Sequence, residues 1–127
     1  RKAVIATGAR AVVPPIEGLA QAGFLTNETV FNLTELPRRL AVVGGGPIGC
    51  ELAQAFGRLG SEVTIIERSA QFLTREDPDA AAILAASLER DGVQVKLNAG
   101  LRKVNVAGDG KHRIMDRDGE QEEIVVD

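Results

Sequence analysis

Hydrophobic and polar residues follow two different periodicities in the middle of the chain. Residues 40–43 and 63–66 are short apolar or β-branched runs, as expected of strands buried in a parallel sheet. Between them, apolar residues recur at steps of three and four, which indicates a helix over residues 47–59 with one buried face. Gly60 follows where a left-handed residue commonly ends a helix. The residues expected on the buried face are Ile48, Leu52, Ala55, Phe56 and Leu59.

A second helix and a third strand are predicted further along the chain. Asp77 can cap this helix, and Pro78 suits its first turn because a missing N–H is harmless there. The helical pattern runs to about Arg90, and residues 93–97 form the next strand-like run. The order strand, helix, strand, helix, strand over residues 40–97 predicts a parallel sheet with right-handed crossovers.

The last part of the chain has a different pattern. Strand-like runs occur at residues 101–106, 111–115 and 123–126. They are separated by Gly and Asp residues at 108–110 and 118–119, which are typical of hairpin turns. The predicted fold class is therefore α/β, a Rossmann-like three-layer domain in which a parallel sheet with a βαβαβ unit is followed by an antiparallel β-meander.

The region before residue 37 carries weaker signals. Residues 3–6 form an apolar run that predicts a buried strand. Residues 10–25 contain two adjacent prolines, so an irregular connection is expected there. Asn27 is a candidate cap for a short helix over residues 28–32.

Composition narrows the classes of protein and site. The chain has 127 residues, which suits one domain, and its 44% hydrophobic content is sufficient for a core. A single cysteine excludes an intrachain disulfide and a zinc knuckle, and a single histidine excludes a His-rich metal site. No metal is therefore expected. Four aromatic residues and a net charge of −3 argue against nucleic-acid binding.

The sequence also bears on where the protein acts. No run of 18 apolar residues is present, so no membrane-spanning segment is predicted. No signal-peptide pattern stands at the start, and a lone cysteine is compatible with a reducing compartment, so we expect a cytoplasmic location. Because the chain begins with Arg1 rather than Met, we also expect it to be part of a longer protein.

One motif carries candidate chemistry, Gly44-x-Gly46-x-x-Gly49, directly between the first predicted strand and helix of the parallel unit. Gly44 permits the tight turn, Gly46 lets a pyrophosphate approach the backbone, and Gly49 lets the helix pack closely on the sheet. The free N–H groups at the helix start would face the phosphates. Glu67, at the end of the second strand, can accept hydrogen bonds from the adenosine ribose. The motif therefore predicts dinucleotide binding.

Two alternatives stay open for this motif. The glycines could serve the geometry of the turn alone, or the ligand could be another nucleoside such as S-adenosylmethionine in a related fold. Three glycines at this spacing together with Glu67 favour a dinucleotide.

Glu67 also bears on which dinucleotide is bound. Its carboxylate would repel a 2′-phosphate, which favours NAD(H) over NADP(H). Arg68 complicates this preference because its guanidinium could pair with that phosphate. Arg75 is a further candidate, although a solvated surface role explains it better.

Three other residues have side chains that could react or titrate: Glu51, Cys50 and His112. Glu51 lies two residues after Gly49, in the predicted first turn of the helix. The helix dipole alone could favour an acidic residue there, or the carboxylate could orient a nicotinamide or a nearby cation. Cys50 is better explained by packing, although a helix start would lower its pKa if the thiol were exposed. His112 is assigned no role.

Residues 6–10 read Ala-Thr-Gly-Ala-Arg, and residues 36–53 read Leu-Pro-Arg-Arg-Leu-Ala-Val-Val-Gly-Gly-Gly-Pro-Ile-Gly-Cys-Glu-Leu-Ala. These two segments resemble the pyridine nucleotide-disulfide oxidoreductases. The stretch Arg75-Glu76-Asp77-Pro78 is most similar to mercuric-reductase-like members, and dihydrolipoamide dehydrogenases belong to the same family. The resemblance covers nearly the whole chain in order.

The resemblance implies a division of the chain and a set of cofactor contacts. Residues 1–36 would be the end of an FAD-domain segment and a connection, and residues 37–127 the NAD(P)H-binding domain. Glu51 would pair with a lysine near the flavin and help to place the nicotinamide, and Leu101 would touch the adenine side. The residues implied to lie beside FAD are Thr7, Gly8 and Ala9. The residues implied to line the nicotinamide cofactor are Gly44, Gly45, Gly46, Pro47, Ile48, Gly49, Cys50 and Glu51.

Several family features are missing from this sequence: the FAD fingerprint, the CxxxxC redox pair and the interface domain with its His-Glu pair. The resemblance therefore implies a larger flavoenzyme, expected to be a homodimer, that passes hydride from NAD(P)H to FAD and then electrons to a cysteine pair. The partners of this chain would be the remaining FAD and interface domains. The alternatives are an NADH oxidase or ferredoxin-reductase-type flavoenzyme, and a stand-alone, non-catalytic nucleotide-binding module.

Overall fold

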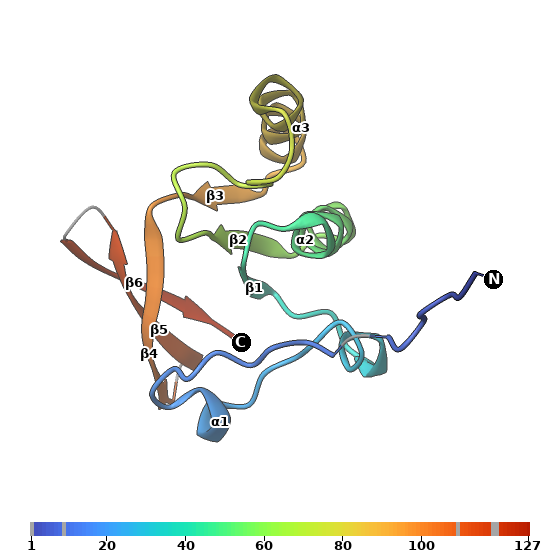
Figure 1. The fold of residues 1–127 in the computed structure, drawn as a ribbon. Coiled ribbons are helices and arrows are strands. Elements are labelled where there is room, and N and C mark those ends of the chain that lie inside the picture. Colours follow the sequence, from blue (N-terminus) through green and yellow to red (C-terminus); the bar gives the residue numbers. More distant parts are fainter. Residues whose placement is uncertain (1, 9, 109, 118–119) are drawn as a thin grey trace.

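The fold has three layers, which Figure 1 shows edge-on. A computed structural model describes residues 2–8, 10–108, 110–117 and 120–127. Two helices, α2 and α3, cover one face of a three-stranded parallel sheet, and a three-stranded antiparallel sheet lies against the other face. The predicted α/β fold with an appended meander is confirmed.

The parallel sheet forms as the apolar runs predict. Its strands are β1 (Arg39–Val43), β2 (Glu62–Ile66) and β3 (Gln94–Lys96), in that spatial order. The crossover helices are α2 (Pro47–Leu59) and α3 (Pro78–Arg90). Both helices lie on one face (Figure 1), as two consecutive right-handed crossovers in the same direction require. The carboxyl ends of β1 and β2 lie side by side because Val43 is in register with Ile66.

The helix ends follow the predicted signals. Pro47 and Pro78 occupy the first turns of α2 and α3. The side chain of Asp77 accepts a hydrogen bond from the Asp79 N–H at 2.9 Å, as an N-cap should. Gly60 ends α2 with a φ of 108°, a value that L-residues rarely adopt.

The buried face of α2 differs from the prediction. The residues turned into the core are the small ones, Cys50 and Ala53, with Phe56 half-buried beside them. Ile48 and Leu59, expected in the core, are 56% and 67% exposed. Ala55, also expected there, is exposed. Small side chains at positions 50 and 53 let the helix backbone approach the sheet closely, so Ile48 and Leu59 lie on the flanks of the helix.

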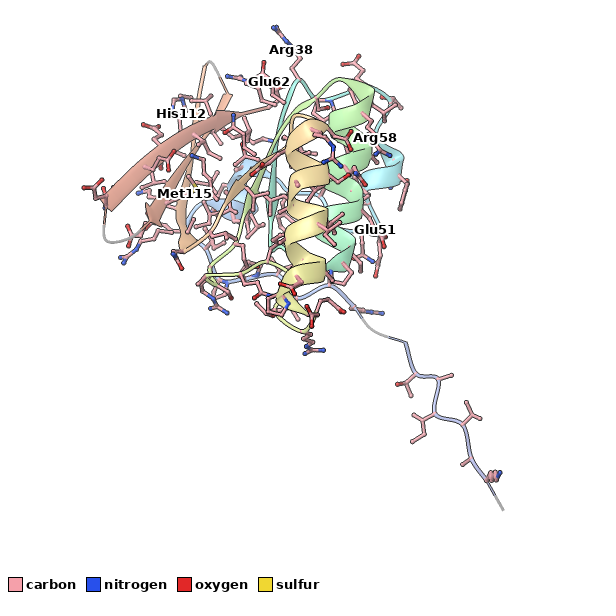
Figure 2. The ribbon with its side chains drawn as sticks, turned by 90° about the horizontal axis from the view of Figure 1, so that it is seen from above. Arg38, Glu51, Arg58, Glu62, His112 and Met115 are labelled. Carbon is pink, nitrogen blue, oxygen red and sulfur yellow. The ribbon has the colours of Figure 1, made fainter. Side chains whose placement is uncertain are left out.

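The meander forms as predicted and packs on the parallel sheet. Its strands are β4 (Ala99–Ala107), β5 (Gly110–Arg117) and β6 (Glu120–Val126), antiparallel and in sequence order. Met115 is fully buried between the two sheets, where it packs with Ile66 and Ala99 (Figure 2). The predicted turn residues Asp109, Asp118 and Gly119 lie outside the described part of the chain.

The strand predicted at residues 3–6 is wrong for this structure. The segment has no strand assignment, and Val4 and Ile5 are 92% and 86% exposed. A strand needs a neighbouring strand to satisfy its backbone groups, and Figure 1 shows this segment extending away from both sheets. Its apolar side chains therefore have no surface to cover within the described residues.

The rest of the N-terminal region lies against the molecule. The short helix α1 (Leu19–Ala22) packs on β4, where Leu19 and Ala22 meet Val104. The helix expected over residues 28–32 is a single 3-10 turn, η1 (Val30–Asn32). Thr29 rather than Asn27 precedes it. The Thr26 and Thr29 hydroxyls accept hydrogen bonds from backbone N–H groups of residues 26–29, just before this turn, and so compete with a helix that starts earlier. Among the described residues, no helix has the length and apolar character needed to cross a membrane.

Replacing Met115 with Ala should lower the free energy of unfolding by about 2–5 kcal/mol, because the change opens a cavity between the two sheets. Chemical denaturation of the full chain measures the effect. Val106→Ala on β4, at a side chain that is 64% exposed, is the control and should change stability by less than about 0.5 kcal/mol. Equal effects of the two variants would show that the sheets do not share a packed interface.

Candidate functional site

The glycine-rich turn lies at the carboxyl edge of the parallel sheet, between β1 and α2. Ligands of open α/β sheets bind at this edge. The N–H of Gly44 still pairs with the carbonyl of Ile66 on β2 at 2.9 Å, so the turn starts directly from the sheet.

Three of the four glycines in this turn are required by the fold itself. Gly44 has a φ of 105°. A Cβ on Gly49 would collide with the carbonyl oxygen of Gly44, and a Cβ on Gly45 would lie 2.7 Å from the Cβ of Phe72. The geometry of the turn therefore explains the glycines at these three positions without any ligand.

Gly46 is different, because no contact with the described residues explains a glycine at this position. Its φ of −81° and ψ of 175° are open to any residue, and a Cβ there would meet no atom within 4 Å. Gly46 also borders a cavity of about 520 Å³, a size within the range of small-molecule sites. A glycine at this position suits a ligand that approaches the backbone.

The start of α2 presents N–H groups to the same cavity. The first hydrogen bond of the helix runs from the Cys50 N–H to the Gly46 carbonyl at 3.0 Å, so the N–H groups of Ile48 and Gly49 precede the helical ladder. These two residues line the cavity together with Gly44, Gly46 and Pro47. The positive end of the helix dipole and the open N–H groups make this edge suitable for a phosphate.

Glu67 holds the glycine turn from the end of β2. Its Oε2 accepts a hydrogen bond from the Gly45 N–H at 2.8 Å, and its Oε1 accepts one from the Ser69 N–H at 2.7 Å. Burial alone raises the pKa of Glu67, but the hydrogen bonds from Gly45, Ser69 and Arg68 outweigh it and hold the pKa below its ordinary value. The carboxylate is thus ionised at neutral pH and presents its acceptor oxygens at the end of β2.

Glu51 lies at a different place in α2 from the one expected, whereas Cys50 is buried as the packing interpretation predicts. Glu51 is the fifth residue of α2, beyond the first turn, so a preference for the helix start does not explain it. Its side chain lies exposed on the flank of the helix and is not among the described residues that line the cavity (Figure 2). The Cys50 thiol is buried in the core. Burial raises its pKa, with smaller contributions from the charges of Glu67 and Glu51, so the thiol is not activated.

The remaining candidates are spread over the molecule. Leu101 on β4 is half-buried and lines the cavity across from α2. Arg68 is exposed beside Glu67. Thr7 and Gly8 are exposed in the extended segment, and Ala9 lies outside the described residues. His112 pairs with Glu123 on the meander.

Three residues of the site gave no signal in the sequence analysis. Ser69 holds Glu67, Phe72 packs against Gly45, and the N–H of Leu73 donates to the Gly45 carbonyl at 2.8 Å. They lie at least 20 positions beyond the last glycine of the motif and belong to the loop between β2 and α3. Among the described residues, no group of His, Cys, Asp and Glu side chains is arranged to hold a metal ion.

Comparison with known proteins identifies the family of the chain. The family model described as pyridine nucleotide-disulphide oxidoreductase matches residues 1–127. A mercuric reductase of Bacillus cereus is 37% identical over 125 residues, which cover 91% of this chain and 20% of the relative. A dihydrolipoyl dehydrogenase of Thermus scotoductus is 38% identical over 133 residues, covering 98% of this chain and 27% of the relative.

A solved structure, the HOCl-induced flavoprotein disulfide reductase RclA of Escherichia coli, superimposes with a TM-score of 0.82 at 38% identity. The match covers 95% of this chain and 27% of that chain. The chain thus spans about a fifth to a quarter of the length of these relatives. It belongs to the pyridine nucleotide-disulphide oxidoreductase family.

Proposed function

We propose that residues 37–127 are the nicotinamide-dinucleotide-binding domain of a flavin-dependent oxidoreductase of this family. The observation that carries the proposal is Gly46, which the fold does not require and which opens onto the cavity at the start of α2. A bulky anion that touches the backbone is the simplest reason for a glycine there.

The residues present fit a dinucleotide. The N–H groups of Gly46, Ile48 and Gly49 would hold the pyrophosphate, and the Glu67 carboxylate, beside the glycine turn, would accept a hydrogen bond from the adenosine ribose. Leu101 would contact the adenine side from the opposite wall of the cavity. When bound, the nicotinamide would supply a hydride and the flavin of the complete protein would accept it.

NAD(H) is the preferred dinucleotide in this proposal. The Glu67 carboxylate has a lowered pKa and stays charged at neutral pH, so a 2′-phosphate at the ribose would be repelled. Arg68 is exposed next to it, but Glu67 is the residue fixed in place by two backbone donors.

The N-terminal segment and Glu51 have roles that depend on the rest of the protein. We propose that Thr7, Gly8 and Ala9 lie beside FAD, which accounts for the exposed apolar residues at positions 4 and 5. Glu51 is exposed on α2 and would be free to pair with a lysine near the flavin. The full reaction would reduce a disulfide or a mercuric ion through a cysteine pair outside this chain, in a protein that we expect to be homodimeric.

Gly46→Val should weaken NADH binding about 100-fold, because the side chain would occupy the path of the pyrophosphate and break its charge-assisted hydrogen bonds. Isothermal titration calorimetry of the full-length protein measures the affinity. Gly100→Val is the matched control, since a Cβ at Gly100 also meets open space but lies on β4. Unchanged binding by Gly46→Val would show that the dinucleotide does not approach this glycine.

Glu67→Gln should raise the affinity for NADPH relative to NADH by about tenfold, a screened Coulomb effect at a half-exposed site. The ratio is the quantity to compare, because Gln keeps only one of the two acceptor oxygens that hold Gly45 and Ser69. Glu62→Gln removes the same charge at the other end of β2 and should leave the ratio unchanged. A constant ratio in Glu67→Gln would contradict selection by charge.

A further inference from the structure

The peptide groups on both sides of Gly45 are fixed by one loop, residues 67–77 between β2 and α3. The Gly45 N–H donates to Glu67 Oε2 at 2.8 Å, and the Gly45 carbonyl accepts from the Leu73 N–H at 2.8 Å. Phe72, buried in the core, lies against the Cα of Gly45. This loop thus holds the middle of the glycine turn in one orientation.

The bond from Leu73 also sets the direction of the next donor along the chain. The peptide bond between Gly45 and Gly46 is trans, and in a trans peptide the C=O and N–H groups point in opposite directions. Because the Gly45 carbonyl points at Leu73, the Gly46 N–H must point away from the core. Gly46 lines the cavity, whereas Gly45 does not.

Leu73 makes this bond from an unfavourable backbone conformation. Its φ is 52°, in the left-handed region that a leucine adopts only when its surroundings hold it there. Asn98 is the other non-glycine residue with a positive φ in the described chain, and asparagine tolerates this region. The Leu73 side chain packs on the core of the helical layer, and its carbonyl accepts from the Glu76 N–H at 2.8 Å. Both contacts hold the conformation that aims the N–H at Gly45.

We propose that Leu73 is a positioning residue of the dinucleotide site, and that its left-handed backbone orients the Gly46 N–H toward the pyrophosphate. The inference rests on the proposed function. The loop between β2 and α3 would then contribute to phosphate binding by orienting the Gly46 N–H, although it contains none of the glycines of the motif.

Three substitutions separate the backbone of Leu73 from its packing. Leu73→Ile keeps the number of side-chain atoms, but its β-branch opposes a positive φ. Leu73→Gly accepts the positive φ freely but loses the packing. Leu73→Met keeps an unbranched side chain of similar volume and is the matched control. Binding of NADH and of adenosine, which lacks the pyrophosphate, is measured by calorimetry on the full-length protein, together with the melting temperature.

We expect Leu73→Ile to weaken NADH binding about tenfold, as for one misdirected donor to a charged group, and to leave adenosine binding unchanged. Leu73→Gly should lower the melting temperature and yet bind NADH within about threefold of wild type. Leu73→Met should match wild type in both ligands.

Equal NADH binding by Leu73→Ile and wild type would overturn the inference alone. A loss in Leu73→Gly as large as in Leu73→Ile, or a parallel loss of adenosine binding in Leu73→Ile, would also overturn it by showing that packing of the loop is responsible. No NADH binding by folded wild-type protein would overturn the proposed function as well.

Discussion

The structure depends on the close packing of backbone and side chains around the turn between β1 and α2. On one side, the carbonyl of Gly44 lies against Gly49 in the first turn of α2, and on the other, Phe72 lies against Gly45. Side chains at these positions would push the helix off the sheet or the loop off the turn. Because the turn is closed on both sides, the start of α2 stays at the carboxyl edge of β1, and its first residues line one cavity.

The arrangement of the parallel unit and the meander could be predicted because its signals are local. Each strand is a short run of apolar residues, and the helix ends are set by Asp77, Pro78 and Gly60 at their own positions. The buried face of α2 could not be predicted in the same way. Hydrophobicity favours Ile48 and Leu59, but the close contact with the sheet selects Cys50 and Ala53, and that contact distance is a tertiary property. The strand expected at residues 3–6 failed for a related reason, since a strand needs a partner.

The candidate site was predictable in part. The spacing of the glycines and Glu67 identifies the turn and the end of β2, and the structure brings them together through the bond from Gly45 to Glu67. It does not identify Ser69, Phe72 or Leu73, because their roles arise from contacts with residues far away in the sequence. No residue pattern marks a leucine that adopts a positive φ, since leucine is a poor choice for that conformation.

The N-terminal segment lies against β4, the edge strand of the antiparallel sheet. These contacts affect where the nucleotide-binding domain could be exchanged during evolution. The Glu17 carbonyl accepts from the Val104 N–H at 2.8 Å, Glu17 pairs with Lys103, and Gly18 lies against the Val104 carbonyl. This segment therefore covers the outer edge of β4, which an exposed strand would otherwise offer to other chains. A recombination junction placed at residue 37 would separate the edge from its cover. An exchangeable unit that keeps this edge covered would therefore include residues 16–22, which precede the first strand of the parallel sheet.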